Sequence, residues 1–175
     1  SRRQRQMCIR DSSKDCAKRL GVAAADTAEA LIEHADTVVL AVKPGVFPSL
    51  LPSIAPYLQE KNPLVISIAA GKTLGFIGEV LGFSPALVRV MPNINAKVGA
   101  AMSAFCANQQ VTQEQKKLVA RLFYAIGQVK ELDEAFFPLF GVIAGSAPAF
   151  AYLFIDSLAR AAVKNCLLYT SPSPR

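Results

Sequence analysis

Three apolar stretches of the sequence end in small, turn-forming or amide residues. They are residues 37–44, 64–71 and 87–93, and the first of them closes with Lys43 and Pro44. Small and kinked residues let a backbone approach a ligand closely. In open α/β sheets, ligands bind just beyond the carboxyl ends of parallel strands. We therefore predict that the three strand ends together form one ligand-binding surface.

The titratable residues near these stretches do not form an acid–base or metal-binding set. His34 is the only histidine, and it stands near the predicted C-terminal end of a helix, where we interpret it as a solvated end residue. Cys8 and Cys166 belong to the chain ends considered below, and the other two cysteines, Cys16 and Cys106, are far apart in sequence. This gives neither a disulfide framework nor metal-ligand spacing and fits a reducing cytoplasm. We identify no catalytic residue and no metal site from the sequence.

Alternating strand and helix patterns predict the elements that position these ends. Residues 37–42 lack charge and are rich in β-branched side chains, which predicts a strand covered on both faces. Thr73 and Gly82 bracket a predicted helix over residues 74–81, and Thr112 begins a capping box for another helix. Such alternation is typical of a doubly wound parallel sheet.

Prolines complicate two of the predicted helices. Pro48, Pro52 and Pro56 favour two short helical pieces over one helix, because an interior proline loses a backbone hydrogen bond. Residues 135–155 carry no charge, and the stretch is long enough to form a membrane-spanning helix. Glycines and prolines interrupt this stretch, so we expect a loop followed by a buried helix, with Ser146 as a potential cap.

Four short motifs occur together in the sequence. Ala-Val-Lys-Pro ends at Pro44, Ser-Ile-Ala-Ala-Gly-Lys-Thr ends at Thr73, Arg-Val-Met-Pro-Asn ends at Asn93, and Gly-Ser-Ala-Pro-Ala-Phe ends at Phe150. In this order and spacing they resemble pyrroline-5-carboxylate reductase, the family of enzymes that makes proline. The resemblance implies an α/β fold in which an incomplete Rossmann-like sheet is followed by the start of an all-helical dimerisation domain. Its boundaries would be residues 13–133 for the NAD(P)-binding part and 134–164 for the helical part.

The same resemblance implies the binding residues. It places Ser146 near the substrate carboxylate, although simple helix capping explains Ser146 equally well. The sequence departs from the family pattern at two places, with Ile94-Asn95 where the family usually has Thr-Pro and Gly141 where it often has threonine. The residues implied to bind the cofactor are Ala41, Val42, Lys43, Pro44, Ile68, Ala69, Ala70, Met91, Pro92 and Asn93.

The implied reaction is hydride transfer from NAD(P)H, with NADP or NAD as cofactor, to the C=N carbon of 1-pyrroline-5-carboxylate. The implied assembly is a homodimer or higher homo-oligomer in the cytoplasm, without a nucleic-acid or membrane partner. One alternative is another reductase related to 6-phosphogluconate dehydrogenase, although the expected final helix offers Arg160 and no interior lysine. A second alternative is a non-catalytic dimerising relative.

The two ends of the chain look like translated sequencing adaptor. Residues 2–11 back-translate to a transposon-end sequence and residues 166–175 to one containing its reverse complement, and neither segment has a helix or strand period, so we assign residues 1–12 and 165–175 to the adaptor. Without them, Lys plus Arg falls from 19 to 14 and Asp plus Glu from 13 to 12, so the net charge falls from +6 to +2. We therefore expect a fragment of a larger gene, with the Gly-x-Gly-x-x-Gly phosphate loop upstream of Ser13. The remaining charges form no basic cluster for nucleic acid.

Overall fold

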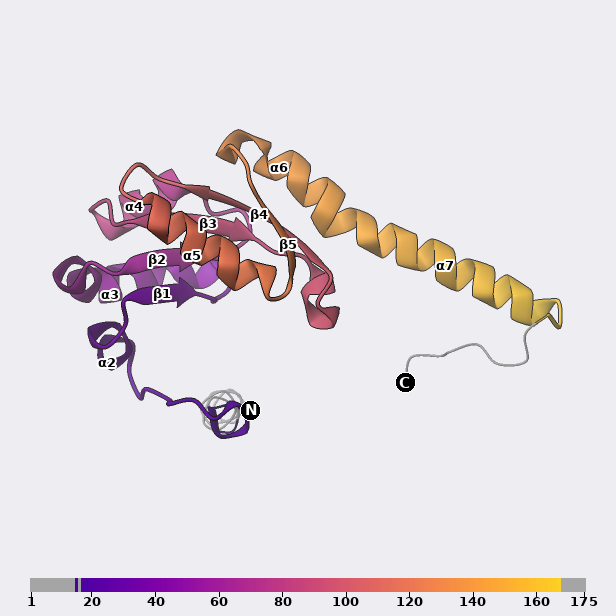
Figure 1. Cartoon of the computed structure of the whole chain (residues 1–175), viewed down its shortest axis with the longest axis horizontal. Helices are drawn as coiled ribbons and strands as arrows, with labels where there is room; N and C mark the ends of the chain where they lie inside the picture. Colours follow the sequence, from indigo (N-terminus) through magenta and orange to yellow (C-terminus); the bar gives the residue numbers. More distant parts are fainter. Residues whose placement is uncertain (1–14, 16, 168–175) are drawn as a thin grey trace.

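The computed structural model describes residue 15 and residues 17–167. It consists of a five-stranded sheet with helices packed against it and one long helix that projects from it (Figure 1). The segments that we interpret as adaptor-derived lie outside the described residues, apart from 165–167. The elements in chain order are α2 (Ala28–Glu33), β1 (Thr37–Leu40), η1 (Pro44–Val46), α3 (Phe47–Lys61), β2 (Leu64–Ser67), α4 (Leu74–Leu81), β3 (Leu87–Met91), η2 (Ile94–Val98), β4 (Ala101–Ala107), α5 (Gln113–Tyr124), β5 (Gly127–Glu131), η3 (Glu134–Phe136), α6 (Phe137–Phe140), η4 (Gly141–Ser146) and α7 (Ala147–Lys164).

The sheet is mostly parallel, as predicted, but one pair of strands is antiparallel. Strand order is β1-β2-β3-β4-β5; β1, β2 and β3 run parallel, whereas β4 runs antiparallel to β3 and parallel to β5. The connection from Met91 to Ala101 contains only the short turn η2. A parallel crossover needs a dozen or more residues, so this connection returns the chain in the opposite direction.

Helices cover both faces of the sheet, which confirms the Rossmann-like prediction. On one face α2, α3 and α4 pack around Val65 and Leu40, and on the other α5 packs around Ile66 and Val90 (Figure 1). The edge strand β1 departs from the prediction, because Val39 is 48% exposed. The side of β1 that carries Val39 is therefore only partly covered.

Helix α3 is one continuous helix, contrary to the prediction of two pieces. Its buried side chains, Phe47, Leu51, Ile54 and Leu58, recur at helical spacing. The prolines within it lie on the exposed side. The carbonyl groups that lose their helical partners therefore face water, and the burial of the opposite side keeps the helix intact.

The apolar stretch over residues 135–155 is helical throughout, so the expected loop and buried helix are both wrong. The helix runs from Glu134 to Lys164 and includes the π-helical segment η4 (Gly141–Ser146). Within it α7 has no buried residue, and most of α7 lies away from the sheet (Figure 1). Its length and mean hydropathy of 1.7 would be enough to cross a membrane.

Candidate functional site

The carboxyl ends of three neighbouring strands meet at one edge of the sheet. In the parallel register, Leu40 of β1 pairs with Ser67 of β2, and Ser67 pairs with Arg89 of β3. The amide of Ile68 donates a hydrogen bond to the carbonyl of Leu40 at 3.3 Å, which joins the first two loops as they leave the sheet. The prediction that the three strand ends share one edge is confirmed.

The predicted cofactor-binding residues differ in how much of each is accessible. Ala41, Val42, Lys43 and Ala70 are exposed, while Ala69 is buried at 5% exposure. The rest of the set, Pro44, Ile68, Met91, Pro92 and Asn93, is partly buried. The edge therefore offers short, exposed side chains beyond β1 and β2, next to which a ligand can approach the backbone closely.

Beyond β3, the side chain of Asn93 joins three segments. Its Nδ2 donates to the carbonyl oxygen of Ala144 at 2.9 Å, and its Oδ1 accepts from the amide of Met102 at 3.2 Å. Gly141 lies beside Met91, since a Cβ built there would be 3.5 Å from the methionine Cε. These contacts place the π-helical segment η4 against the end of β3.

Ser146, the residue predicted near the substrate, is the last residue of η4 and is exposed. The expectation that Ser146 caps a helix is wrong, because its side chain makes no capping hydrogen bond. The helix is continuous through this position, so no free helix start exists there for the serine to cap. Its hydroxyl remains accessible.

A partly buried ion pair next to this edge was missed by sequence reasoning. Arg89 lies in β3 at 6% exposure, and its Nη1 donates to Oε1 of Glu134 at 2.8 Å. The same oxygen accepts from the amide of Leu74, the first residue of α4, at 2.9 Å. The Arg89 guanidinium also lies 4.5 Å from the ring centre of Phe137. The available signal was a single charge inside an otherwise apolar strand.

The ion pair influences a neighbouring cysteine. Cys106 of β4 is buried, and burial together with the nearby Glu134 carboxylate raises the pKa of its thiol to about 12. A thiol in this state is neutral at physiological pH and is a poor nucleophile. Cys106 is therefore a packing residue at this place in the sheet.

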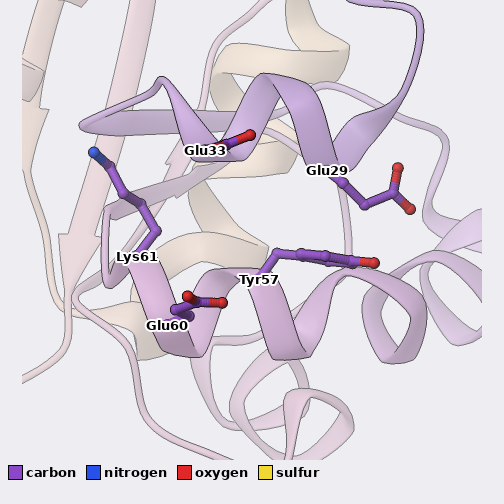
Figure 2. A pocket seen from close by; sticks show the side chains of 5 residues that line it. All are labelled: Glu29, Glu33, Tyr57, Glu60 and Lys61. Atoms are coloured by element: carbon purple, nitrogen blue, oxygen red, sulfur yellow. The ribbon is translucent and has the colours of Figure 1, made fainter.

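A separate hollow lies between α2 and α3 and contains none of the predicted site residues. It is lined by Tyr57, Lys61 and the carboxylates of Glu29, Glu33 and Glu60 (Figure 2). Lys61 ends α3 just before β2 begins, so the hollow is not at the carboxyl ends of the strands. It plays no part in the site that we describe.

His34 is also distant from the site. It terminates α2 as an exposed residue, and its Nδ1 lies 3.1 Å from the carbonyl oxygen of Ala30. This matches the interpretation of His34 as a solvated helix-end residue. Across residue 15 and residues 17–167, no group of three or more His, Cys, Asp or Glu side chains is placed to hold a metal ion.

Sequence comparisons agree with this geometry. Residues 6–71 match the family described as NADP oxidoreductase coenzyme F420-dependent. Pyrroline-5-carboxylate reductase of Aquifex aeolicus is 33% identical over 156 residues, which are 89% of this chain and 57% of the relative. The Escherichia coli enzyme of the same name is 38% identical over 146 residues, covering 83% of this chain and 54% of the relative.

Solved structures of pyrroline-5-carboxylate reductases are also similar to this chain. The Plasmodium falciparum pyrroline carboxylate reductase, solved with NADP bound, has a TM-score of 0.76 at 38% identity, covering 82% of this chain and 54% of that one. The Streptococcus pyogenes enzyme has a TM-score of 0.77 at 34% identity, covering 89% and 58%. Prephenate dehydrogenase from Aquifex aeolicus, at a TM-score of 0.57 and 17% identity, shares the fold alone.

The chain spans about half the length of the relatives that it matches. The matches extend across both the sheet and the long helix, since they cover more than four fifths of the chain. Together with the converging strand ends, they show that this chain is similar over most of its length to pyrroline-5-carboxylate reductases.

Proposed function

We propose that this chain forms the cofactor side of a pyrroline-5-carboxylate reductase. The complete enzyme would transfer a hydride from NADPH or NADH to the C=N carbon of 1-pyrroline-5-carboxylate, and the imine nitrogen would carry a proton to give L-proline. The observation that supports this most is the convergence of β1, β2 and β3 at one edge, with small residues beyond β1 and β2. The NADP-bound Plasmodium relative supports the cofactor.

The residues at this edge fit a dinucleotide by shape. Ala41 and Ala70 are exposed and carry only methyl groups, so a nucleotide can lie against the backbone there. Lys43 adds an exposed cation beside them. A bound nicotinamide would supply the hydride, and the task of these residues is to bind and orient it. An imine is basic enough to carry its own proton, so no histidine or carboxylate pair is needed at the strand ends.

We also propose that the chain is part of a longer enzyme. Residues 13–133 would be the later part of the NAD(P)-binding domain and residues 134–164 the start of a helical dimerisation and substrate domain. The half-length match to the relatives supports this division, as does the projecting helix. We expect the isolated chain to form no proline, and the complete enzyme to act in the cytoplasm.

The test uses the complete reading frame that contains residues 13–164, with NAD(P)H oxidation followed in the presence of 1-pyrroline-5-carboxylate. Ala70→Phe should raise the KM for the cofactor about tenfold, because overfilling a close contact costs roughly 1–3 kcal/mol. Ala30→Phe is the matched control, since Ala30 is also exposed but lies on α2 away from the strand ends. No oxidation with either cofactor would refute the proposed reaction.

A second copy of the chain is the partner that we propose for α7. Phe150, Leu153, Phe154 and Leu158 are all more than half exposed, and an apolar surface of this kind is typical of an interface. Asp156 and Arg160 form a salt bridge on the same helix, at 2.7 Å, and charged groups are costly within a bilayer.

Sedimentation of the chain with and without lipid vesicles distinguishes a protein–protein interface from a lipid bilayer as the surroundings of α7. We expect a dimer that does not bind vesicles and that dissociates when Leu153 is replaced by Glu. Leu20→Glu, at a position that is also exposed but distant from α7, is the control. Recovery of the chain with the vesicles would refute this proposal.

A further inference from the structure

Asn93 uses both ends of its side-chain amide for contacts within the protein. Its Nδ2 donates to the carbonyl of Ala144 in η4, and its Oδ1 accepts from the amide of Met102 in β4. The residue is partly buried at the point where β3 ends. Both bonds are made to other segments of the chain, so the protein itself fixes the orientation of this amide, which keeps one N–H and one lone pair.

The carbonyl group of Ala144 that accepts from Asn93 precedes a proline by four residues. Ala144 lies in the π-helical segment η4, and the residue four positions later, which would be the donor to its carbonyl with α-helical spacing, is Pro148 and has no N–H. Asn93 supplies a donor at 2.9 Å in its place. The same stretch is π-helical, a form that occurs mostly as single turns at functional positions.

We infer that Asn93 is a positioning residue, which holds the π-helical segment η4 against the end of β3 and so fixes where Ser146 stands beside the cofactor edge. The inference rests on the proposed function for the role of Ser146. It changes the role first expected for Asn93, from a cofactor ligand to the support of the segment proposed to meet the substrate. Gly141 beside Met91 allows the same close approach one turn earlier.

Hydrogen–deuterium exchange of this chain, measured by mass spectrometry, tests the contact directly. Asn93→Asp keeps the oxygen that accepts from Met102 and replaces the donor to Ala144 with a second oxygen. We expect exchange in peptides spanning η4 to rise about tenfold, the factor that corresponds to one lost hydrogen bond. Exchange in β2 should stay unchanged and serves as the internal reference.

Asn95→Asp is the matched control for charge. Asn95 lies two residues away, and its Oδ1 accepts from the Tyr152 hydroxyl at 2.5 Å, a contact that a carboxylate keeps. Its exchange pattern should equal that of the unmodified chain. Adding Pro148→Ala to Asn93→Asp supplies an amide to Ala144, and exchange in η4 should return to that of Pro148→Ala alone.

Turnover in the complete reading frame separates positioning from cofactor binding. Asn93→Asp should raise the KM for 1-pyrroline-5-carboxylate and leave the KM for NAD(P)H unchanged. Adding Pro148→Ala should return the KM for 1-pyrroline-5-carboxylate to that of Pro148→Ala alone. A rise confined to the cofactor KM would overturn the inference, as would equal exchange in the Asn93 and Asn95 variants or the absence of rescue.

If Asn93→Asp unfolds the whole chain, Asn93→Ser removes the contact without charge and is expected to behave in the same way. Exchange is measured without substrate or cofactor. Failure of the positioning role therefore leaves the proposed reductase activity standing, and failure of the activity leaves the exchange result interpretable.

Discussion

The Arg89–Glu134 ion pair provides a quantitative test of how the long helix is attached to the sheet. Glu134→Ala removes the carboxylate that accepts from both Arg89 and the amide of Leu74. The Arg89 side chain is only 7% exposed, so the variant leaves a buried guanidinium without its partner. The attachment of helix 134–164 should weaken as a result.

The size of the effect follows from burial. Breaking a fully buried pair from one side costs about 3–5 kcal/mol. The Glu134 side chain is 28% exposed, so water can reach the Arg89 guanidinium once the carboxylate is removed. We therefore expect a loss of free energy of unfolding at the lower end of this range, about 3 kcal/mol. In a domain of this size that loss lowers the Tm by about 6–12 °C. Replacing both partners, as Arg89→Met with Glu134→Ala, should bring stability back to within about 1 kcal/mol of the original.

Urea unfolding followed by circular dichroism measures these differences, with Glu131→Ala as the control. Glu131 pairs with Lys116 at 2.6 Å, but the two side chains are 50% and 24% exposed. Loss of such a pair is worth less than about 1 kcal/mol. The reasoning is refuted if Glu134→Ala costs no more than Glu131→Ala, or if the double variant is as unstable as the single one.

Three further predictions concern the sheet, a thiol and a helix. Gly127→Ala should cost more than about 3 kcal/mol in a urea melt, because φ is +147° and a Cβ would stand 2.2 Å from the Ala101 carbonyl oxygen, whereas Gly45→Ala, with nothing within 4 Å, should be nearly neutral. Because burial raises the pKa of Cys106 to about 12 and an unfolded thiol ionises near pH 8.5, stability should fall as pH rises between about 9 and 12, and Cys106→Ala should remove that part of the slope in urea melts. Pro52→Ala should raise the free energy of unfolding by about 1–2 kcal/mol, since an interior helical proline costs roughly 3 kcal/mol and part of this is offset by the stiffer unfolded chain; an unchanged urea midpoint would contradict this.

Local sequence signals determined the bounds of several elements. Thr73 accepts from the amide of Phe76, and Gly82 ends α4 at φ +75°, as the sequence predicts. The capping box begun by Thr112 forms completely. These features depend on residues within one turn of each other, so short-range chemistry decides them. The converging strand ends were predictable for a related reason, because consecutive parallel strands joined by helices share a direction.

Tertiary structure decided what no single segment contains. The reversal of β4, the exposure of Val39 and the continuity of α3 depend on which elements lie next to each other. The two polar ties between β3 and the long helix join residues far apart in sequence, Arg89 with Glu134 and Asn93 with Ala144. Their partners meet only after the chain has folded, because a hydrogen bond requires distance and direction that residue order alone does not specify.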